Sequence, residues 1–159
     1  HVVEGGSRLV RQDSEVSEEG GRRVMENIRI MLDTSAYSAF LRGNAQVKQA
    51  LQEADEIYVN PVVLGELYAG FSRGGREKKN KEILRDFLAS PRVQVIPVAE
   101  ETAERYAAII TYLWSQGTPV PTSDLWIAAT AMQYGLKLVT TDSHYQNMPQ
   151  IIVECCTVN

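Results

Sequence analysis

The chain has 159 residues, of which 44% are hydrophobic and 23% are charged, an ordinary composition for one globular domain with a sizeable core. No apolar run approaches the roughly 18 residues that span a membrane, and the N-terminus lacks the apolar segment of a signal peptide, so we expect a soluble, cytoplasmic protein. The net charge of −4 argues against a nucleic-acid binder held by a global positive field, but it leaves room for a local basic strip.

Residues 1–25 differ from the rest of the chain. They show no strong periodicity, and the stretch 14–21 is acidic and glycine-rich. The first methionine, Met25, stands just before the first apolar run. We expect residues 1–25 to be a weakly structured N-terminal extension or an expression remnant, and residues 26–159 to form the working domain. A short arm that docks on the body or on a partner is the alternative.

Strand and helix patterns alternate along the remaining chain. Apolar runs predict strands over 30–32, 56–60, 93–97, 136–140 and 151–153. Amphipathic spacing predicts helices over 35–41, 47–54, 62–71, 76–89, 100–114 and 124–134. This alternation predicts an α/β fold with three layers, α/β/α, in which helices cover both faces of a central, mainly parallel sheet of four to five strands.

Acidic residues stand at comparable places in this pattern. Asp33 and Asp142 each end an apolar strand, and Asp124 opens a helix, where free N–H groups favour negative charge. Glu66 lies within a helix, on the side expected to face the sheet. Thr34 or Ser35 is expected to cap the helix that follows Asp33. Each acid alone is explained as a helix cap, a dipole partner or a residue at a helix rim.

Together, the four acids predict a metal site. Like charges brought close together repel, and a divalent cation removes that penalty. Oxygen ligands without a His or Cys cluster favour Mg²⁺ or Mn²⁺ over zinc. The carboxyl edge of an open α/β sheet is where ligands bind. A site of this kind usually serves metal-assisted hydrolysis of phosphodiesters.

Four motifs follow one another in order: Leu-Asp-Thr-Ser at 32–35, Gly-Glu-Leu at 65–67, Ser-Asp-Leu-Trp-Ile-Ala-Ala-Thr-Ala at 123–131, and Thr-Thr-Asp-Ser-His-Tyr at 140–145. With them, residues 28–153 resemble the PIN-domain ribonucleases, and among these the VapC-type toxins of bacterial and archaeal toxin–antitoxin pairs. The resemblance implies a PIN-like fold and a Mg²⁺- or Mn²⁺-dependent endoribonuclease that cleaves RNA. It also implies a homodimer, and a cognate antitoxin that covers the active cleft.

The resemblance also assigns residues. It implies that Asp33, Glu66, Asp124 and Asp142 are the catalytic and metal-binding residues. It further implies that a small polar residue after a strand, Thr34, Ser35 or Thr141, steadies a carboxylate or a water at the metal. Tyr145 stands where family members often show Phe. His144 invites a general-base role, with a cap of its own loop as the alternative.

Basic residues follow the Glu66 helix. Arg73 and Arg76 are candidate contacts for RNA phosphates. Lys78, Lys79 and Lys81 are interleaved with Glu77 and Glu82 and fit a solvated helix face equally well.

Apolar side chains on the early helices have three explanations. They can form core, a homodimer face, or a groove for an antitoxin helix; the residues are Tyr37, Phe40, Leu41, Tyr68 and Phe71.

Two other functions compete with the nuclease. A receiver-like phosphoacceptor domain expects paired acids at the first strand and a late lysine after a Thr-bearing strand, whereas Asp33 stands alone and Lys137 begins its strand. The other is a PIN fold that binds or processes RNA without a toxin role. Cys155 and Cys156 are adjacent and are expected to be reduced thiols.

Overall fold

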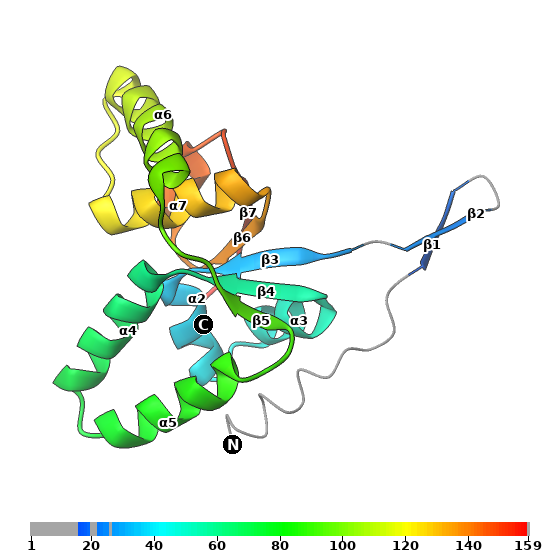
Figure 1. Ribbon diagram of the computed structural model, residues 1–159, viewed down its shortest axis with the longest axis vertical. Helices are drawn as coiled ribbons and strands as arrows, with labels where there is room; N and C mark the ends of the chain where they lie inside the picture. The colour runs from blue at the N-terminus through cyan, green and yellow to red at the C-terminus, as the bar shows by residue number, and fades with distance from the viewer. Residues whose placement is uncertain (1–15, 20–21, 26, 159) are drawn as a thin grey trace.

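The computed structural model describes residues 16–19, 22–25 and 27–158 (Figure 1). Strands β1 (Val16–Glu19) and β2 (Arg22–Met25) pair antiparallel in a two-stranded sheet of their own. The predicted N-terminal extension over 1–25 falls largely on residues outside the described ranges, so that part of the domain division stays a prediction.

The main sheet has five strands, all parallel to their neighbours. The strands are β3 (Arg29–Leu32), β4 (Glu56–Val59), β5 (Val93–Val95), β6 (Lys137–Thr140) and β7 (Ile152–Cys155). Their spatial order is β5-β4-β3-β6-β7. In the three central strands every residue after the first is buried, as expected for a parallel sheet covered on both faces.

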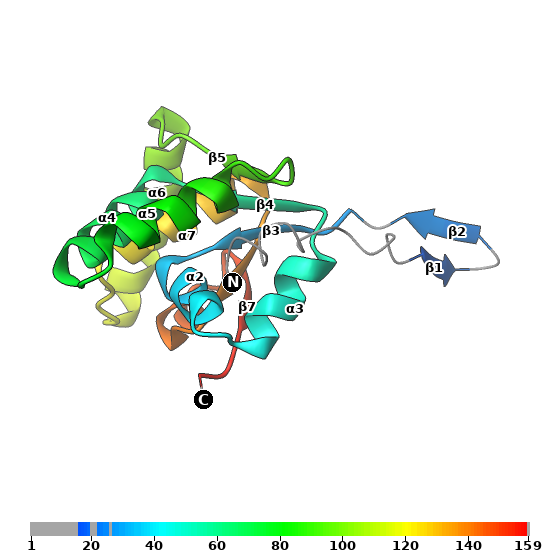
Figure 2. The same ribbon diagram turned by 90° about the horizontal axis from the view of Figure 1, so that it is seen from below.

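Six α-helices connect the strands of the main sheet. They are α2 (Thr34–Leu41), α3 (Ala45–Glu53), α4 (Pro61–Arg73), α5 (Glu77–Leu88), α6 (Glu100–Gln116) and α7 (Thr122–Tyr134). In Figure 1, α6 and α7 lie toward the top, beside β6 and β7, and α4 and α5 lie toward the bottom. Figure 2 shows α2 and α3 together on the side of β3 away from α6 and α7. The three-layer α/β/α prediction is confirmed. Within the described residues, no helix has both the length and the hydropathy to cross a bilayer.

The order of the strands alone, without regard to side chains, predicts where a ligand would bind. The chain runs outward from β3 to β4 and β5, then returns past β3 to β6 and β7. The order therefore reverses between β3 and β6, and such a switch point is where open α/β sheets bind ligands. The carboxyl ends of both strands meet there, followed by Asp33 and by the segment 141–142.

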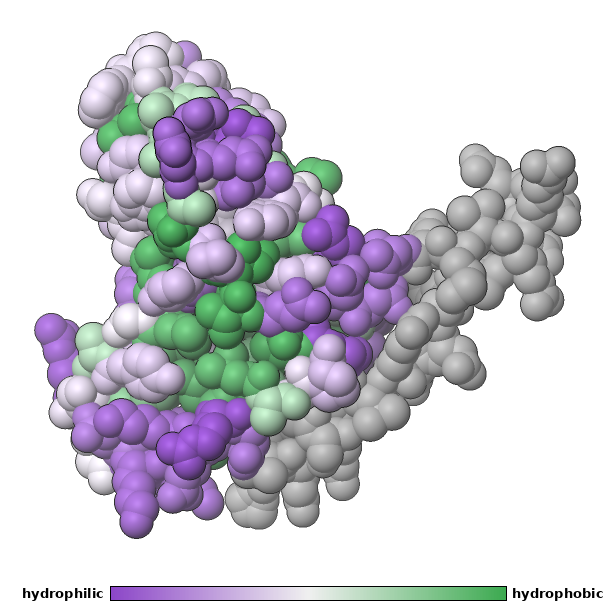
Figure 3. Space-filling model, in the orientation of Figure 1, coloured by the Kyte–Doolittle hydropathy of each residue, from purple (hydrophilic) through white to green (hydrophobic). Residues whose placement is uncertain are grey.

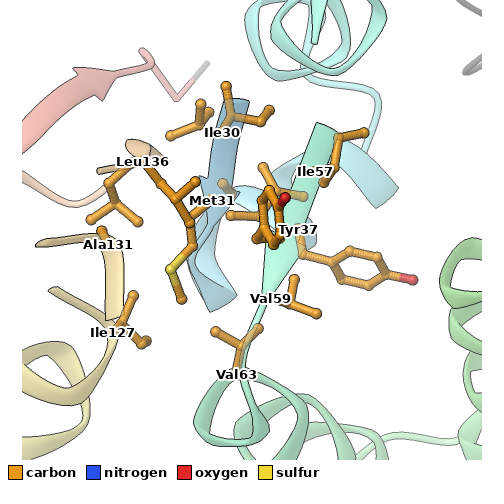
Figure 4. Packing of buried hydrophobic residues seen from close by; sticks show 14 of the residues in the cluster. Ile30, Met31, Tyr37, Ile57, Val59, Val63, Ile127, Ala131 and Leu136 are labelled. Carbon is orange, nitrogen blue, oxygen red and sulfur yellow. The ribbon is translucent and has the colours of Figure 1, made fainter. Parts of the chain in front are cut away.

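Both faces of the sheet are packed with apolar side chains (Figure 4). Met31 points toward Ile127 and Ala131 of α7. On the opposite layer, the ring of Tyr37 meets Phe87 edge-on, with 5.2 Å between ring centroids.

The apolar side chains of the early helices, which the sequence left as core, homodimer face or antitoxin groove, belong mostly to this core. Tyr37, Phe40 and Phe71 are buried, and Leu41 packs against the core while partly exposed. Tyr68 is the member that remains at the surface, with 42% of its area exposed.

The hydroxyl of Tyr37 gives a test of this core. It is buried, and it has no hydrogen-bond partner in the described part of the chain. A buried unsatisfied polar group costs roughly 1–3 kcal/mol. We therefore expect Tyr37→Phe to raise the free energy of unfolding by about 1 kcal/mol, measured by urea denaturation, whereas Phe87→Ala should lower it by roughly 3–5 kcal/mol. A loss of stability in Tyr37→Phe would show that the hydroxyl has a partner.

Candidate active site

Asp33 is the buried centre of the site. It follows β3 and precedes α2, and the residue is 3% exposed. Its Oδ1 accepts a hydrogen bond from the backbone N–H of Ala36 at 2.8 Å, so Asp33 is the N-cap of α2. The expectation that Thr34 or Ser35 caps this helix was wrong, because both residues already lie in its first turn.

Two hydroxyl groups hold the Asp33 carboxylate from different elements. Ser35 Oγ lies 2.8 Å from both carboxylate oxygens, and Thr140 Oγ1 donates to Oδ2 at 2.6 Å. Thr140 Oγ1 also accepts from the backbone N–H of Asp142 at 2.9 Å. Ser35 Oγ accepts from the backbone N–H of Thr141 at 3.1 Å. The ends of β3, α2 and β6 are thus joined at one carboxylate.

Thr140 is the hydroxyl that sequence reasoning missed. On this strand the expected residue was Thr141, named with Thr34 and Ser35 as a small polar residue after a strand, but the contact that Thr141 makes here is through its backbone N–H. The strand register decides between them: Leu32 pairs with Val139, so the next residue of each strand, Asp33 and Thr140, lie beside each other.

Glu66 reaches the same edge from α4. Thr34 Oγ1 donates to its Oε1 at 2.6 Å, which gives Thr34 a supporting contact of the kind expected. The start of α4 is fixed by Asn60, a fully buried residue that sequence reasoning did not single out. Asn60 Oδ1 caps the helix at Val63, and its Nδ2 donates to Thr130 Oγ1 of α7 at 2.9 Å.

Asp124 and Asp142 meet at the rim of the site. Asp124 lies in the first turn of α7, and Asp142 caps the 3₁₀ helix η1 (Ser143–Asn147). The Nδ1 atom of His144 lies 3.1 Å from Asp142 Oδ1 and 3.4 Å from Asp124 Oδ2. The buried Tyr145 donates its hydroxyl to Asp124 Oδ1 at 3.2 Å, a contact that Phe at this position could not make.

Burial and mutual repulsion make the acids weaker than usual. Burial raises the pKa of Asp33 to about 6, against the opposing effect of its hydrogen bonds, and the charge of Asp124 adds to the rise. The pKa of Asp124 is raised by burial and by Asp142, although His144 and Tyr145 oppose the rise. Burial, followed by the charges of Asp33 and Asp124, raises the pKa of Tyr145 far above its usual range.

Arg73 and Arg76 lie outside this cluster. Both are exposed, Arg73 at the end of α4 and Arg76 at the N-cap of α5. With about 1.5 Å of rise per helical residue, Arg73 lies roughly 10 Å along α4 from Glu66. Their role in binding RNA stays a prediction.

Comparison with known proteins identifies the family to which this fold belongs. Residues 30–150 match the family described as PIN domain. The chain belongs to the PIN-domain family. Similar proteins include a Ribonuclease VapC of Rickettsia bellii, 32% identical over 78% of this chain and 93% of the relative, and a Ribonuclease VapC1 of Rickettsia felis, 34% identical over 70% and 83%. Among solved structures, VapBC2 from Rickettsia felis bound to a promoter DNA fragment superposes with a TM-score of 0.70, covering 79% of this chain and 96% of that chain at 25% identity.

The side chains of this PIN domain fit a metal ion. PIN-domain nucleases are metal-dependent, and the ligand atoms of Asp124, Asp142 and His144 all lie within 4.8 Å of one another. The raised pKa values of Asp33 and Asp124 reflect negative charge held under burial and repulsion, which a bound cation would offset.

A matched pair of substitutions separates the two neighbouring threonines. Thr140→Val deprives two groups of a partner, the Asp33 carboxylate and the Asp142 backbone N–H. We expect the free energy of unfolding to fall by about 1–3 kcal/mol. Thr141→Val keeps the backbone N–H that donates a hydrogen bond to Ser35 Oγ. It should change the free energy of unfolding by less than about 0.5 kcal/mol. The measurement is urea denaturation of both variants at pH 7.5 in EDTA. Equal losses of unfolding free energy would contradict the assignment of Thr140 as the hydroxyl that donates to Asp33.

Asp33 also sets a pH dependence in the metal-free protein. Its folded-state pKa of about 6 lies above the ordinary 3.8, so the fold favours the neutral acid. This contribution to stability is fully present below pH 3.8 and is lost as the pH rises through about 6. The difference corresponds to roughly 3 kcal/mol.

We therefore expect Asp33→Asn, which is neutral at every pH, to be more stable than wild type at pH 7.5 by up to roughly 3 kcal/mol and to lose this advantage near pH 4. The measurement is urea denaturation in EDTA between pH 4 and 7.5. Other titrating groups are common to both proteins, so the difference isolates Asp33. A constant difference across this range would contradict the raised pKa.

Proposed function

We propose that this PIN domain is an endoribonuclease that hydrolyses phosphodiester bonds in RNA, with Mg²⁺ or Mn²⁺ held by Asp33, Glu66, Asp124 and Asp142. One observation supports the proposal: Asp33 and Asp142 follow the neighbouring parallel strands β3 and β6 at the switch point of the sheet. The charge of Asp124 acts on Asp33, and Thr34, the residue after Asp33, donates a hydrogen bond to Glu66. Relatives of this chain carry the name ribonuclease, which supports the same reaction.

The polar contacts of the site prepare the acids for this role. Asp33 is oriented by the Ser35 and Thr140 hydroxyls, Asp124 by Tyr145, and Glu66 by Thr34. When bound, a divalent ion supplies an activated water and stabilises charge on the leaving oxygen. Carboxylates that are already fixed need little reorganisation when the substrate arrives.

A toxin role follows from the relatives. Solved neighbours are complexes such as VapBC2 of Rickettsia felis and FitAcB of Neisseria gonorrhoeae, the latter 28% identical with a TM-score of 0.64. We propose that this chain is likewise the toxin of a toxin–antitoxin pair. Its expected homodimer stays a prediction.

A groove between α4 and α5 is suited to an antitoxin helix. Its lining combines apolar Tyr68, Ala69 and Leu88 with the cations of Lys81 and Arg85. Figure 3 shows apolar side chains gathered across the middle of this face, above the hydrophilic outer surface of α5. An amphipathic helix with an acidic border would match both features.

The receiver-like alternative loses support from the position of Lys137. A phosphoacceptor site needs its lysine at the acidic edge, whereas Lys137 begins β6 and its Nζ pairs with Glu154 at 2.8 Å. A PIN fold that only binds RNA keeps the same geometry, so a cleavage assay must separate that function from the nuclease.

The test is cleavage of total RNA by the purified, antitoxin-free chain in Mg²⁺, in Mn²⁺ and in EDTA. We expect cleavage with either metal and none in EDTA. Asp33→Asn should lower the rate by about 100-fold or more while the protein stays folded, because it removes one negative charge at nearly constant shape. Asp86→Asn, the same change at an exposed position of α5, is the control and should cleave like wild type.

Unchanged cleavage by Asp33→Asn would refute the site assignment. Absence of cleavage with both metals, in a protein that still binds RNA, would favour the binding-only function.

A further inference from the structure

His144 lies where it could be a metal ligand, a role other than the general base or loop cap that the sequence suggested. It is one of two histidines in the chain, and the other, His1, lies outside the described residues. Because a single histidine is no cluster in sequence, the expected site had oxygen ligands alone. In the fold, the imidazole Nδ1 faces a carboxylate oxygen of each rim acid, at 3.1 Å for Asp142 and 3.4 Å for Asp124.

The local structure fixes this orientation. The backbone N–H of His144 donates to Asp142 Oδ1 at 2.9 Å, which holds the first turn of η1 against the acid. The next residue, Tyr145, is buried and binds Asp124 through Oδ1, so Asp124 Oδ2 is the oxygen that faces the imidazole. The His144 side chain is 48% exposed, so an ion can reach the three groups from solvent.

We propose that His144 completes, with Asp124 and Asp142, a three-ligand site for a divalent transition-metal ion. The inference rests on the proposed function, since it concerns the same acidic centre. Its three ligand atoms lie within 4.8 Å of one another, close enough to meet at one ion. Two oxygens and one imidazole nitrogen are a donor set for Mn²⁺ or a later transition metal, whereas Mg²⁺ prefers oxygen and retains its waters. Coordination by the imidazole nitrogen therefore makes the site bind Mn²⁺ in preference to Mg²⁺.

A different role for His144 predicts the opposite result. A protonated imidazole between two carboxylates would itself supply the positive charge and compete with the ion. Removing it would then strengthen metal binding, whereas removing a ligand weakens it. The two roles are separated by the sign of one change in affinity.

The experiment uses the full chain, freed of metal with EDTA and then titrated with Mn²⁺ alone. Electron paramagnetic resonance of free Mn²⁺ gives the dissociation constant, and pulsed measurements on the bound ion detect directly coordinated ¹⁴N. We expect a ¹⁴N coupling in wild type that is absent in His144→Gln, together with an approximately tenfold weaker Mn²⁺ affinity. Mg²⁺ affinity, measured by calorimetry, should change little. Gln146→Ala, an exposed change on the same turn, is the control and should behave as wild type.

Bound Mn²⁺ without a ¹⁴N coupling, or tighter Mn²⁺ binding in His144→Gln, would overturn the inference. If metal-dependent RNA cleavage persists in that case, the proposed function stands and only the nitrogen ligand is refuted. If wild type binds no Mn²⁺ and cleaves RNA equally in EDTA, both the inference and the proposed metal site fail.

Discussion

The burial of one carboxylate is the constraint around which this PIN domain is organised. Asp33 is nearly inaccessible to solvent, yet it accepts hydrogen bonds from its own helix and from the neighbouring strand. These bonds favour the charged form, but burial outweighs them and the pKa rises to about 6. The same carboxylate therefore joins three elements and remains poorly compensated, a condition that a bound cation relieves. Stability and function compete at this residue, as is common where a site is built into a core.

Topology decides which layers contribute to the site. Glu66 comes from α4 and Asp124 from α7, whereas Asp33 and Asp142 follow the strands β3 and β6. Helices α4 and α7 are joined through Asn60, which caps α4 and binds Thr130 of α7. A buried side-chain amide whose oxygen and nitrogen both form hydrogen bonds fixes the distance between α4 and α7 more firmly than apolar packing alone.

The sequence sufficed for the sheet, because alternating periodicities are local signals. The shared metal site of the four acids stays a prediction. The sequence did not suffice for contacts that depend on register. Thr140 rather than Thr141 reaches Asp33, because Leu32 pairs with Val139. Tyr37 and Phe40 could not be assigned to core or interface, since an apolar helix face does not reveal what covers it. The role of Tyr145 was hidden for the same reason: its hydroxyl meets a residue 21 positions earlier.

Caps and candidate ligands coincide twice in this site, and the two cases differ in a useful way. Asp33 and Asp142 both follow a strand, and each caps the helix that comes next in the chain, α2 and η1 respectively. At Asp33 one side chain performs both tasks, so a change there alters folding and metal binding together unless the cap oxygen is kept. At η1 Asp142 also performs both tasks, but the neighbouring candidate ligand, His144, binds the cap through its backbone N–H while its imidazole faces the acids. Changing this side chain leaves the cap in place, so an effect on metal binding would report the imidazole itself and not a loss of local structure.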